Sequence, residues 1–399
     1  MNFKMNLNEA KNYATTYLMS TYSQLPVLFV RGEGSYLYDN EGKEYLDFFS
    51  GIAVNNLGYC HEKIIEAITT QAHNLLHVSN LYYTEPMLKL AKFLVEQSGL
   101  RGGKVFFCNS GTEANEAALK LARLYGFDKN KTKIVSALNS FHGRTMGGLS
   151  LTGQRKYQEK FYPLVPEITY TVFNDPKALE HDLTDDTAAL FLECVQGEGG
   201  VRPALEEYLK KAREICNQKD ILLVFDEVQT GVGRTGEFFA YKNYAILPDV
   251  VTLAKGLGGG LPLGAVIATD QAAVFNPGQH ASTFGGNPLT TRAALAVTEI
   301  ISQPEFLKTV KNQAVLLQKL LNKPHPLIKE VRGLGLMLGV ELIIPASEVV
   351  KKALNLGLII GTAGENVIRL LPPLNITEQE ILKGVELFYN SLSCFGEKR

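Results

Sequence analysis

In the stretch Ile221-Leu-Leu-Val-Phe-Asp-Glu-Val-Gln229, a run of mostly aliphatic residues stops at an acid, Asp226. A second run, Val250-Val-Thr-Leu-Ala-Lys255, stops at a lysine, and the glycine-rich segment Gly256-Leu-Gly-Gly-Gly260 follows it. Short aliphatic runs of this kind predict strands that are buried on both faces. The pattern therefore places a carboxylate and an amine, each at the carboxyl end of a buried strand.

Strand-like runs alternate with helical patterns from about residue 60 to about residue 285. Helices are predicted over Lys63–Leu76, Glu85–Gln97, Thr112–Tyr125 and Glu206–Lys219. Strands are predicted over Lys104–Cys108, Lys133–Ala137, Ala188–Glu193, Ile221–Asp226, Val250–Ala254 and Leu263–Ala268. Alternation of this kind predicts an α/β domain with a mostly parallel central sheet.

The sequence changes character towards its carboxyl end. Asn287-Pro288 is a turn signal, and a helical pattern, Leu289–Ile301, follows it. Ile328–Leu342 alternates like a strand pair, and Val367–Leu371 like another short strand, which predicts a smaller α+β domain. The hairpin signal at Tyr36–Tyr45 predicts that the N-terminal segment joins this domain. We predict three parts: an N-terminal segment (residues 1–50), a large cofactor-binding domain (51–287) and a small C-terminal domain (288–399).

The bulk composition narrows the class of protein. The chain has 399 residues, of which 45% are hydrophobic, and its net charge is −1. That charge gives no reason to expect nucleic acid or an anionic membrane as a partner. The sequence contains no apolar run long enough to span a bilayer and starts with no secretory signal pattern. Its five scattered cysteines predict reduced thiols and a cytoplasmic location.

Asp226 and Lys255 together suit pyridoxal 5'-phosphate. This cofactor needs a lysine that forms a Schiff base with its aldehyde and an anion that keeps its ring nitrogen protonated. Lys255 is flanked by small and apolar residues, which favours a lowered pKa and a nucleophilic amine. From these residues alone, a solvated lysine and a strand end that points into water remain open, and so does a weak metal site at Asp226-Glu227.

Two further segments could serve such a cofactor. Ser110-Gly-Thr-Glu113 follows a strand and opens a helix; Ser110 with Glu113 fits a capping box, and the N–H groups at the helix start could bind phosphate. In Phe141-His-Gly-Arg-Thr145, the aromatic ring could stack on a cofactor, and Arg144 could bind a substrate carboxylate. An ordinary capped helix and a solvated surface loop are the alternatives.

Two other patterns carry less weight. Gly231-Val-Gly-Arg-Thr-Gly236 matches a dinucleotide-binding motif, but Glu227 to Thr230 separate it from the strand and no clear helix opens at Gly236. His73 and His77 have the spacing of one helical face, but no third zinc ligand is apparent. We therefore predict no nicotinamide site and no metal site.

Taken in order, the motifs resemble those of the class III (subgroup II) aminotransferases that use pyridoxal phosphate, over nearly the whole length from Pro26. The similar segments are Ser50–Gly58, Asn109–Glu116, Phe141–Thr145, Gln196–Val201, Asp226–Gly236, Ala254-Lys255, Ser282–Pro288 and Ile368–Pro373. The resemblance implies a fold-type I transferase that works as a homodimer with shared active sites.

The resemblance also implies roles for individual residues. Lys255 would carry the cofactor, Asp226 would pair with the ring nitrogen, and these two would be the catalytic residues. The other cofactor-binding residues would be Ser110, Gly111 and Thr112 at the phosphate, Phe141 and Val228 on the ring, Gln229 at the phenolic oxygen, and Thr283 at the neighbouring subunit's phosphate. Substrate would be bound by Arg144, by the gate formed by Glu198 and Arg369, by Ser282, and by Tyr22 if the donor is ornithine.

Within this family the chain is most similar to members that act on N2-acetyl-L-ornithine. The resemblance implies ping-pong amino transfer to 2-oxoglutarate, giving N-acetyl-L-glutamate 5-semialdehyde and L-glutamate in arginine biosynthesis. Ornithine, succinyldiaminopimelate and 4-aminobutyrate aminotransferases are the alternatives. Outside the family, a scaffold protein without catalysis would keep the fold and lose the yellow cofactor band.

Overall fold

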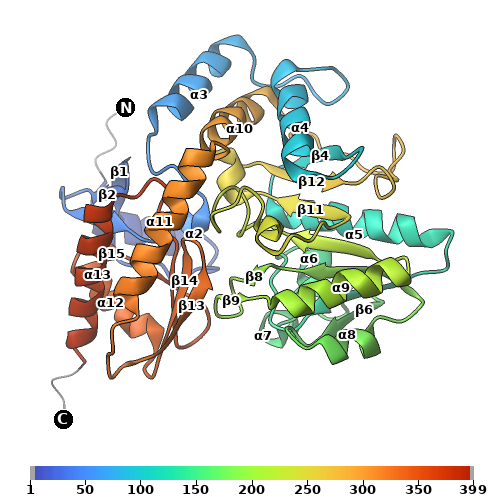
Figure 1. Cartoon of the computed structure of the whole chain (residues 1–399). Helices are drawn as coiled ribbons and strands as arrows, with labels where there is room; N and C mark the ends of the chain where they lie inside the picture. Colours follow the sequence, from blue (N-terminus) through green and yellow to red (C-terminus); the bar gives the residue numbers. More distant parts are fainter. Residues whose placement is uncertain (1–4, 396–399) are drawn as a thin grey trace.

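A seven-stranded mixed sheet forms the centre of the computed structural model, which describes residues 5–395 (Figure 1). In spatial order its strands are β4 (Lys104–Cys108), β12 (Gly264–Ala268), β11 (Val250–Leu253), β10 (Leu222–Asp226), β7 (Thr187–Leu192), β5 (Lys133–Ala137) and β6 (Ile168–Thr171). Only β12 runs antiparallel to its neighbours in this sheet, because the connection from β11 is too short for a helical crossover. The predicted mostly parallel sheet is confirmed.

Helices cover both faces of this sheet. α5 (Gly111–Phe127) packs on one face, whereas α4 (Glu85–Ser98), α8 (Pro176–Asp182) and α9 (Glu206–Gln218) pack on the other. Successive residues of β10 alternate between the two layers: Leu222 and Val224 belong to the core under α5, and Leu223 and Phe225 to the core under α9. Burial on both faces explains why this strand is aliphatic throughout.

The remaining helices connect or flank these layers. Their bounds are α1 (Leu7–Tyr17), α2 (Ser50–Ala53), α3 (Glu62–Asn74), α6 (Met146–Leu151), α7 (Arg155–Gln158), α10 (Pro288–Ile301), α11 (Pro304–Leu321), α12 (Ala346–Asn355) and α13 (Glu378–Ser393), with 3₁₀ turns η1 (Ala240–Tyr244) and η2 (Lys255–Gly258). α10 starts where the Asn287-Pro288 turn signal predicts: Asn287 caps it, and Pro288 is its first residue. α10 packs against α3 and α4.

Two four-stranded sheets lie beside the central one. The first contains β13 (Ile328–Leu334), β14 (Met337–Leu342), β17 (Val367–Leu370) and β16 (Gly361–Thr362), all antiparallel. The second contains β1 (Phe29–Glu33), β2 (Tyr36–Asp39), β3 (Glu44–Asp47) and β15 (Leu358–Ile359), so that the N-terminal strands pair with a C-terminal one. Figure 1 shows α11, α12 and α13 beside these sheets. The domain division at residues 50 and 287 stays a prediction.

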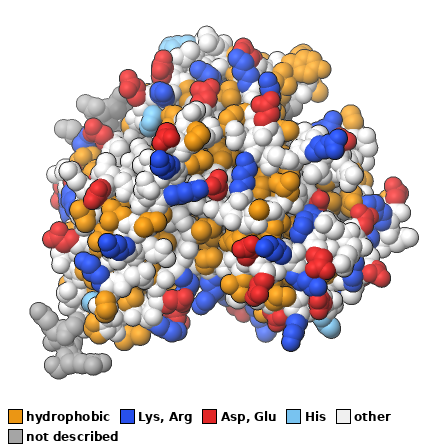
Figure 2. Space-filling view, in the orientation of Figure 1, with side chains coloured by type: hydrophobic (Ala, Val, Ile, Leu, Met, Phe, Trp, Pro, Cys, Tyr) orange, Lys and Arg blue, Asp and Glu red, His pale blue; other side chains and the backbone are white. Residues whose placement is uncertain are grey.

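A small hairpin, β8 (Val195–Gln196) and β9 (Arg202–Pro203), connects β7 to α9 and contacts β13. On the face drawn in Figure 2, acidic and basic side chains are interspersed, in keeping with the net charge of −1. Within residues 5–395, no helix is both long enough and apolar enough to cross a bilayer.

Candidate active site

The ends of two neighbouring strands bring Asp226 and Lys255 to one edge of the central sheet. β10 and β11 pair in parallel, β10 ends at Asp226, and Lys255 begins the 3₁₀ turn directly after β11. Both residues line a cavity of about 450 Å³ at this edge. The carboxyl edge of a parallel sheet is a common place for a ligand in α/β folds. The sequence-based expectation of an acid and an amine at the ends of buried strands is met in this cavity.

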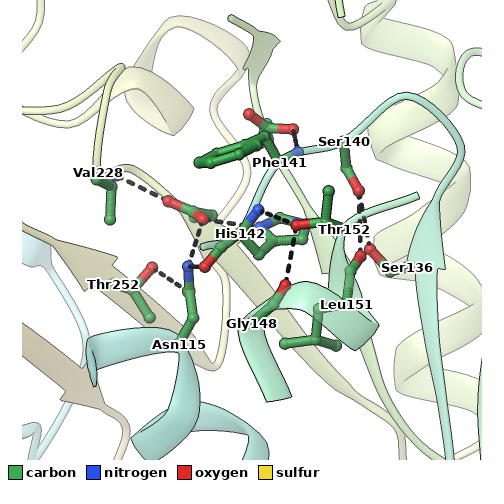
Figure 3. A network of polar contacts seen from close by, with 12 residues as sticks. Asn115, Ser136, Ser140, Phe141, His142, Gly148, Leu151, Thr152, Val228 and Thr252 are labelled. Carbon is green, nitrogen blue, oxygen red and sulfur yellow. Dashed lines mark hydrogen bonds and ion pairs between the residues drawn. The ribbon is translucent and has the colours of Figure 1, made fainter. Parts of the chain in front are cut away.

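The Asp226 carboxylate accepts three hydrogen bonds, and the residues that donate them, His142, Asn115 and Val228, are labelled in Figure 3. Its Oδ2 accepts one from His142 Nδ1 and one from Asn115 Nδ2, both at 2.7 Å, and its Oδ1 accepts one from the Val228 N–H at 2.9 Å. Thr252 Oγ1 donates in turn to Asn115 Oδ1 at 2.9 Å. Burial acts to raise the pKa of Asp226, but the hydrogen bond and attraction of His142 lead the interactions that bring it below its usual value. The acid is therefore ionised inside the protein.

Lys255 is largely but not completely buried, and it is less basic than an ordinary lysine. Burial, followed by repulsion from Arg369, lowers its pKa to about 8, although Glu198, Asp226 and Glu193 act in the opposite direction. About a tenth of the amine is consequently unprotonated at pH 7, far more than for an ordinary lysine, and the unprotonated form is the one that a nucleophile or a base requires.

Glu193, which follows β7, is a second acid in the cavity and behaves differently from Asp226. Burial, and then repulsion from Asp226, raise its pKa well above the usual value. Its Oε2 accepts a hydrogen bond of 3.2 Å from the Phe141 N–H. Burial thus favours the neutral form of Glu193, whereas the hydrogen bonds to Asp226 favour its ionised form.

The start of α5 forms another wall of the cavity. Ser110 is its N-cap and accepts from the Glu113 N–H at 3.3 Å. The predicted capping box is wrong in its second half, because the Glu113 side chain accepts instead from the N–H of Asn109, one residue before the cap, at 2.5 Å. Gly111 allows close packing here: a Cβ on it would lie 2.6 Å from Val228 Cγ1. The first N–H groups of the helix, at Gly111 and Thr112, face no earlier turn that could accept from them.

A buried ion pair stands at the side of the cavity towards β17. Arg369 Nη1 lies 2.6 Å from Glu198 Oε1 and 3.1 Å from Gln229 Oε1, and the Arg369 side chain is 3% exposed. Glu198 belongs to the turn between β8 and β9. Separating the two groups without supplying another anion would be costly, because it would leave the buried Arg369 guanidinium unpaired.

Arg144 lies at another part of the cavity and is exposed. Its guanidinium carbon is 4.2 Å from the centre of the Tyr157 ring and 5.4 Å from that of Phe141. The Arg144 guanidinium lies over the faces of these two rings. Such contacts use none of its N–H donors, which stay free for a planar anion.

The comparisons with known proteins agree with this geometry. A family model described as aminotransferase class-III matches residues 17–392. An acetylornithine aminotransferase of Caldanaerobacter subterraneus subsp. tengcongensis is 48% identical over 96% of this chain and 98% of its own length, and one of Aquifex aeolicus is 50% identical over 93% and 98%. The ornithine aminotransferase structure of Toxoplasma gondii superimposes with a TM-score of 0.94 at 31% identity, covering 99% of this chain and 97% of that one.

The chain belongs to the class III aminotransferases.

As a class III aminotransferase, the chain is a transaminase whose cofactor is pyridoxal 5'-phosphate, and the cavity fits that group. Lys255 is the buried amine that the aldehyde requires, Asp226 is the ionised acid that a protonated ring nitrogen requires, and the start of α5 is a seat for phosphate. The family assignment confirms the cofactor that the sequence predicts.

Most of the residues predicted for the site of this class III enzyme line one cavity. They are Ser110, Gly111, Thr112, Phe141, Arg144, Glu198, Asp226, Val228, Gln229 and Lys255, and Arg369 joins them through its ion pair with Glu198. Their individual roles stay predictions.

Three predicted site residues lie elsewhere. Ser282 and Thr283 border a separate depression beside His280 and Phe284, and Ser282 Oγ accepts from the Gly285 N–H at 3.0 Å. Tyr22 is 85% exposed and does not line the cavity. Any role of these residues in catalysis requires a second subunit or a movement of the N-terminal segment.

The sequence reasoning missed three polar residues of the cavity. His142 and Asn115 bind Asp226, and Glu193 is the acid whose pKa is raised by burial. All three stand within or next to motifs already quoted, and His142 and Glu193 follow the ends of β5 and β7. Their position after neighbouring strands was the available signal.

The two patterns given little weight are explained by packing. Residues 231–236 form turns and no helix opens at Gly236. Arg234 within them is fully buried and donates to Leu336 O, Pro372 O and Asn56 Oδ1. α3 ends at Asn74, so His73 and His77 do not share a helix, and the His77 ring packs near Phe284.

Proposed function

We propose that this aminotransferase converts N2-acetyl-L-ornithine and 2-oxoglutarate to N-acetyl-L-glutamate 5-semialdehyde and L-glutamate, in arginine biosynthesis. The observation that carries the proposal is the closed Glu198–Arg369 pair at 2.6 Å, with Arg144 free elsewhere in the same cavity. The names of the relatives from Caldanaerobacter and Aquifex support the same donor.

Arg144 selects the donor by its distal carboxylate. Acetylornithine carries that carboxylate at the end that bears the acetylated amine, so a bidentate pair with Arg144 directs the δ-amine towards Lys255. Glu198 neutralises Arg369 at the same time, because no second carboxylate arrives with this substrate. A donor without a carboxylate would leave Arg144 unpaired.

Glutamate requires the gate to open. Its α-carboxylate competes with Glu198 for Arg369, and its other carboxylate takes Arg144. A single cavity can thus accept a δ-amine and an α-amine in turn, which is the requirement of a ping-pong reaction.

Lys255 and Asp226 supply the chemical groups of the protein. Pyridoxal phosphate, when bound, supplies the aldehyde that takes up the amino group and the ring that withdraws electrons. Lys255, with its pKa lowered to about 8, moves a proton between the reacting carbon and its acceptor. Asp226 would keep the ring nitrogen of the bound cofactor protonated, and Val228 and Phe141, which line the same cavity, would pack against its ring.

We also propose a cytoplasmic homodimer in which Thr283 reaches the phosphate of the partner subunit. Thr283 and Ser282 lie outside the cavity of their own chain. Asn80 Nδ2 donates to Ser282 O and Gly285 O, so this segment lies beside residues 80–83, and large apolar side chains are exposed on both: Leu81, Tyr82, Tyr83 and Phe284. Exposed apolar side chains of this size are typical of subunit interfaces. Free cysteines suit a reducing compartment.

A panel of amine donors tests the function. Acetylornithine, ornithine, succinyldiaminopimelate and 4-aminobutyrate are compared by kcat/KM with 2-oxoglutarate, and acetylornithine is expected to be preferred. A clear preference for ornithine would contradict the proposal and would turn attention to Tyr22. Double-reciprocal plots are expected to be parallel, and light scattering is expected to give the mass of a dimer.

A further inference from the structure

Three residues on neighbouring strands form one row across the small antiparallel sheet. Arg332 of β13 pairs with Gly339 of β14, and Gly339 pairs with Arg369 of β17. Residues directly opposite each other in an antiparallel sheet present their side chains on the same face. The row therefore carries an arginine on each side of a residue that has no side chain.

The turn that carries Glu198 lies over this row. At one end of the row, Arg369 Nη1 lies 2.6 Å from Glu198 Oε1. At the other end, Arg332 Nε donates to Gly200 O at 2.9 Å. Between them, a Cβ on Gly339 would lie 2.8 Å from the Cβ of Val201, so the turn fills the space that the glycine leaves.

Arg332 is itself firmly oriented. Its side chain is 8% exposed, and its Nη1 lies 2.6 Å from Glu341 Oε2 and 2.5 Å from Glu330 Oε2. Glu341 also pairs with Arg202 at 3.6 Å, just beyond the turn. A buried guanidinium with these partners has little freedom, so the carbonyl of Gly200 is bound to a fixed donor.

We propose that Arg332 is a positioning residue for the gate: it fixes the turn of residues 197–201 and so sets how readily Glu198 releases Arg369. The inference rests on the proposed function, in which Glu198 gives way to the α-carboxylate of glutamate. With the backbone of the turn bound at Gly200, only the Glu198 side chain moves when the gate opens. The closed pair re-forms when glutamate leaves, and the cavity returns to the state that suits a δ-amine donor.

The test compares the two half-reactions in Arg332→Met. Each is followed in a single turnover by the loss of the cofactor's absorbance, with glutamate or with acetylornithine. Loss of the Arg332–Gly200 hydrogen bond frees the turn and weakens the hold of Glu198 on Arg369. The α-carboxylate of glutamate then displaces Glu198 more easily. The ratio of kcat/KM for glutamate to kcat/KM for acetylornithine is expected to rise by about fivefold, the net effect of one ordinary intramolecular hydrogen bond.

Lys329→Met is the matched control. Lys329 is also on β13 and also binds Glu341, but it does not touch the turn. Its ratio is expected to equal that of the wild type. Hydrogen exchange of residues 195–203, measured in the cofactor-free proteins, is expected to be faster in Arg332→Met alone.

Glu341→Gln is the second variant in case Arg332→Met does not fold, because it keeps the volume and weakens the orientation of Arg332; it should move the ratio in the same direction. An unchanged or falling ratio in a folded variant overturns the proposal, and so does unchanged exchange of the turn. A general loss of folding would lower both half-reactions alike. Failure of the proposed function would instead appear as a wild-type enzyme that does not turn over acetylornithine. In that case the inference is tested with glutamate alone: the KM for glutamate is expected to fall in Arg332→Met, and an unchanged KM would overturn the inference.

Discussion

The two sides of the cavity are built in different ways. The cofactor side consists of residues at the ends of adjacent strands of one sheet; Asp226 is buried and held by hydrogen bonds, and Lys255 directly follows the next strand. The substrate side consists of a loop arginine, Arg144, and an ion pair between the β8–β9 turn and β17. In the proposed function, the sheet thus places the chemical groups, whereas the choice of substrate depends on contacts between separate parts of the chain.

The largest effect is expected for Lys255→Ala. Without the buried amine, the yellow absorbance band of the purified enzyme should disappear and activity should fall by about 10⁴-fold, the upper range for loss of an acid–base group. Lys177→Ala, on the exposed surface of α8, should keep both. A yellow and active Lys255→Ala enzyme would remove the basis of the cofactor side.

A smaller loss is expected for Asp226→Asn. Asparagine keeps the size of the side chain but not the charge that keeps the ring nitrogen protonated, so kcat should fall by about 10³-fold. Glu227→Gln is the control, because Glu227 is buried outside the cavity and accepts from the N–H groups of Ala240 and Tyr241. Equal losses in both variants would mean that Asp226 acts through the fold alone.

The substrate side should respond selectively. In Glu198→Gln, Arg369 loses its anionic partner and becomes available to any α-carboxylate, so kcat/KM for glutamate relative to acetylornithine should rise by about tenfold. The absorbance of the bound cofactor should not change, because Lys255 and Asp226 are untouched. A fall in both half-reactions by the same factor would show that the two sides are not separable.

The pH dependence of cofactor binding reports on Lys255. Since its pKa is lowered to about 8, the free amine grows as the pH rises, and the rate at which cofactor-free enzyme becomes yellow should increase by about fivefold between pH 7 and pH 8 and level off above that. Repulsion from Arg369 contributes to the lowered pKa, so Arg369→Met should move the midpoint to higher pH. A midpoint that stays in place would show that the two sides are electrically independent.

The smallest effect is expected at the phosphate seat. Ser110→Ala removes the N-cap of α5 and should lower the free energy of unfolding by about 1 kcal/mol, measured in urea without cofactor. Thr377→Ala removes the N-cap of α13, far from the cavity, and should cost a similar amount. Only Ser110→Ala should also weaken cofactor binding.

The same contrast explains what could be predicted from the sequence. Asp226 and Lys255 were recognisable because a strand buried on both faces is visible as an aliphatic run, and its end is therefore visible too. The class III motifs then supplied Glu198 and Arg369. Neither the aliphatic runs nor the class III motifs indicate how β13, β14 and β17 pair. The row that joins Arg332 to Arg369 could therefore not be predicted.

Side-chain networks were equally hidden. His142 and Asn115 were quoted within motifs, but their bonds to Asp226 depend on how α5 and the loop after β5 meet over the sheet. The reversal of β12 depends on the length of a connection, and the half-made capping box depends on which N–H the Glu113 side chain reaches. Tertiary packing determines these hydrogen-bond partners and this strand direction, and a local sequence pattern does not reveal tertiary packing.

The buried guanidinium of Arg234 joins a turn of the large sheet to Asn56, Leu336 and Pro372, which are spread across most of the chain. Its hydrogen bonds connect the segment after β10 to segments near the N-terminus and the C-terminus of the chain. A chimaera could take its small antiparallel sheet from one homologue and its central sheet from another. It must then inherit Arg234 and the residues that bind it from the same parent, because otherwise a buried guanidinium loses its partners.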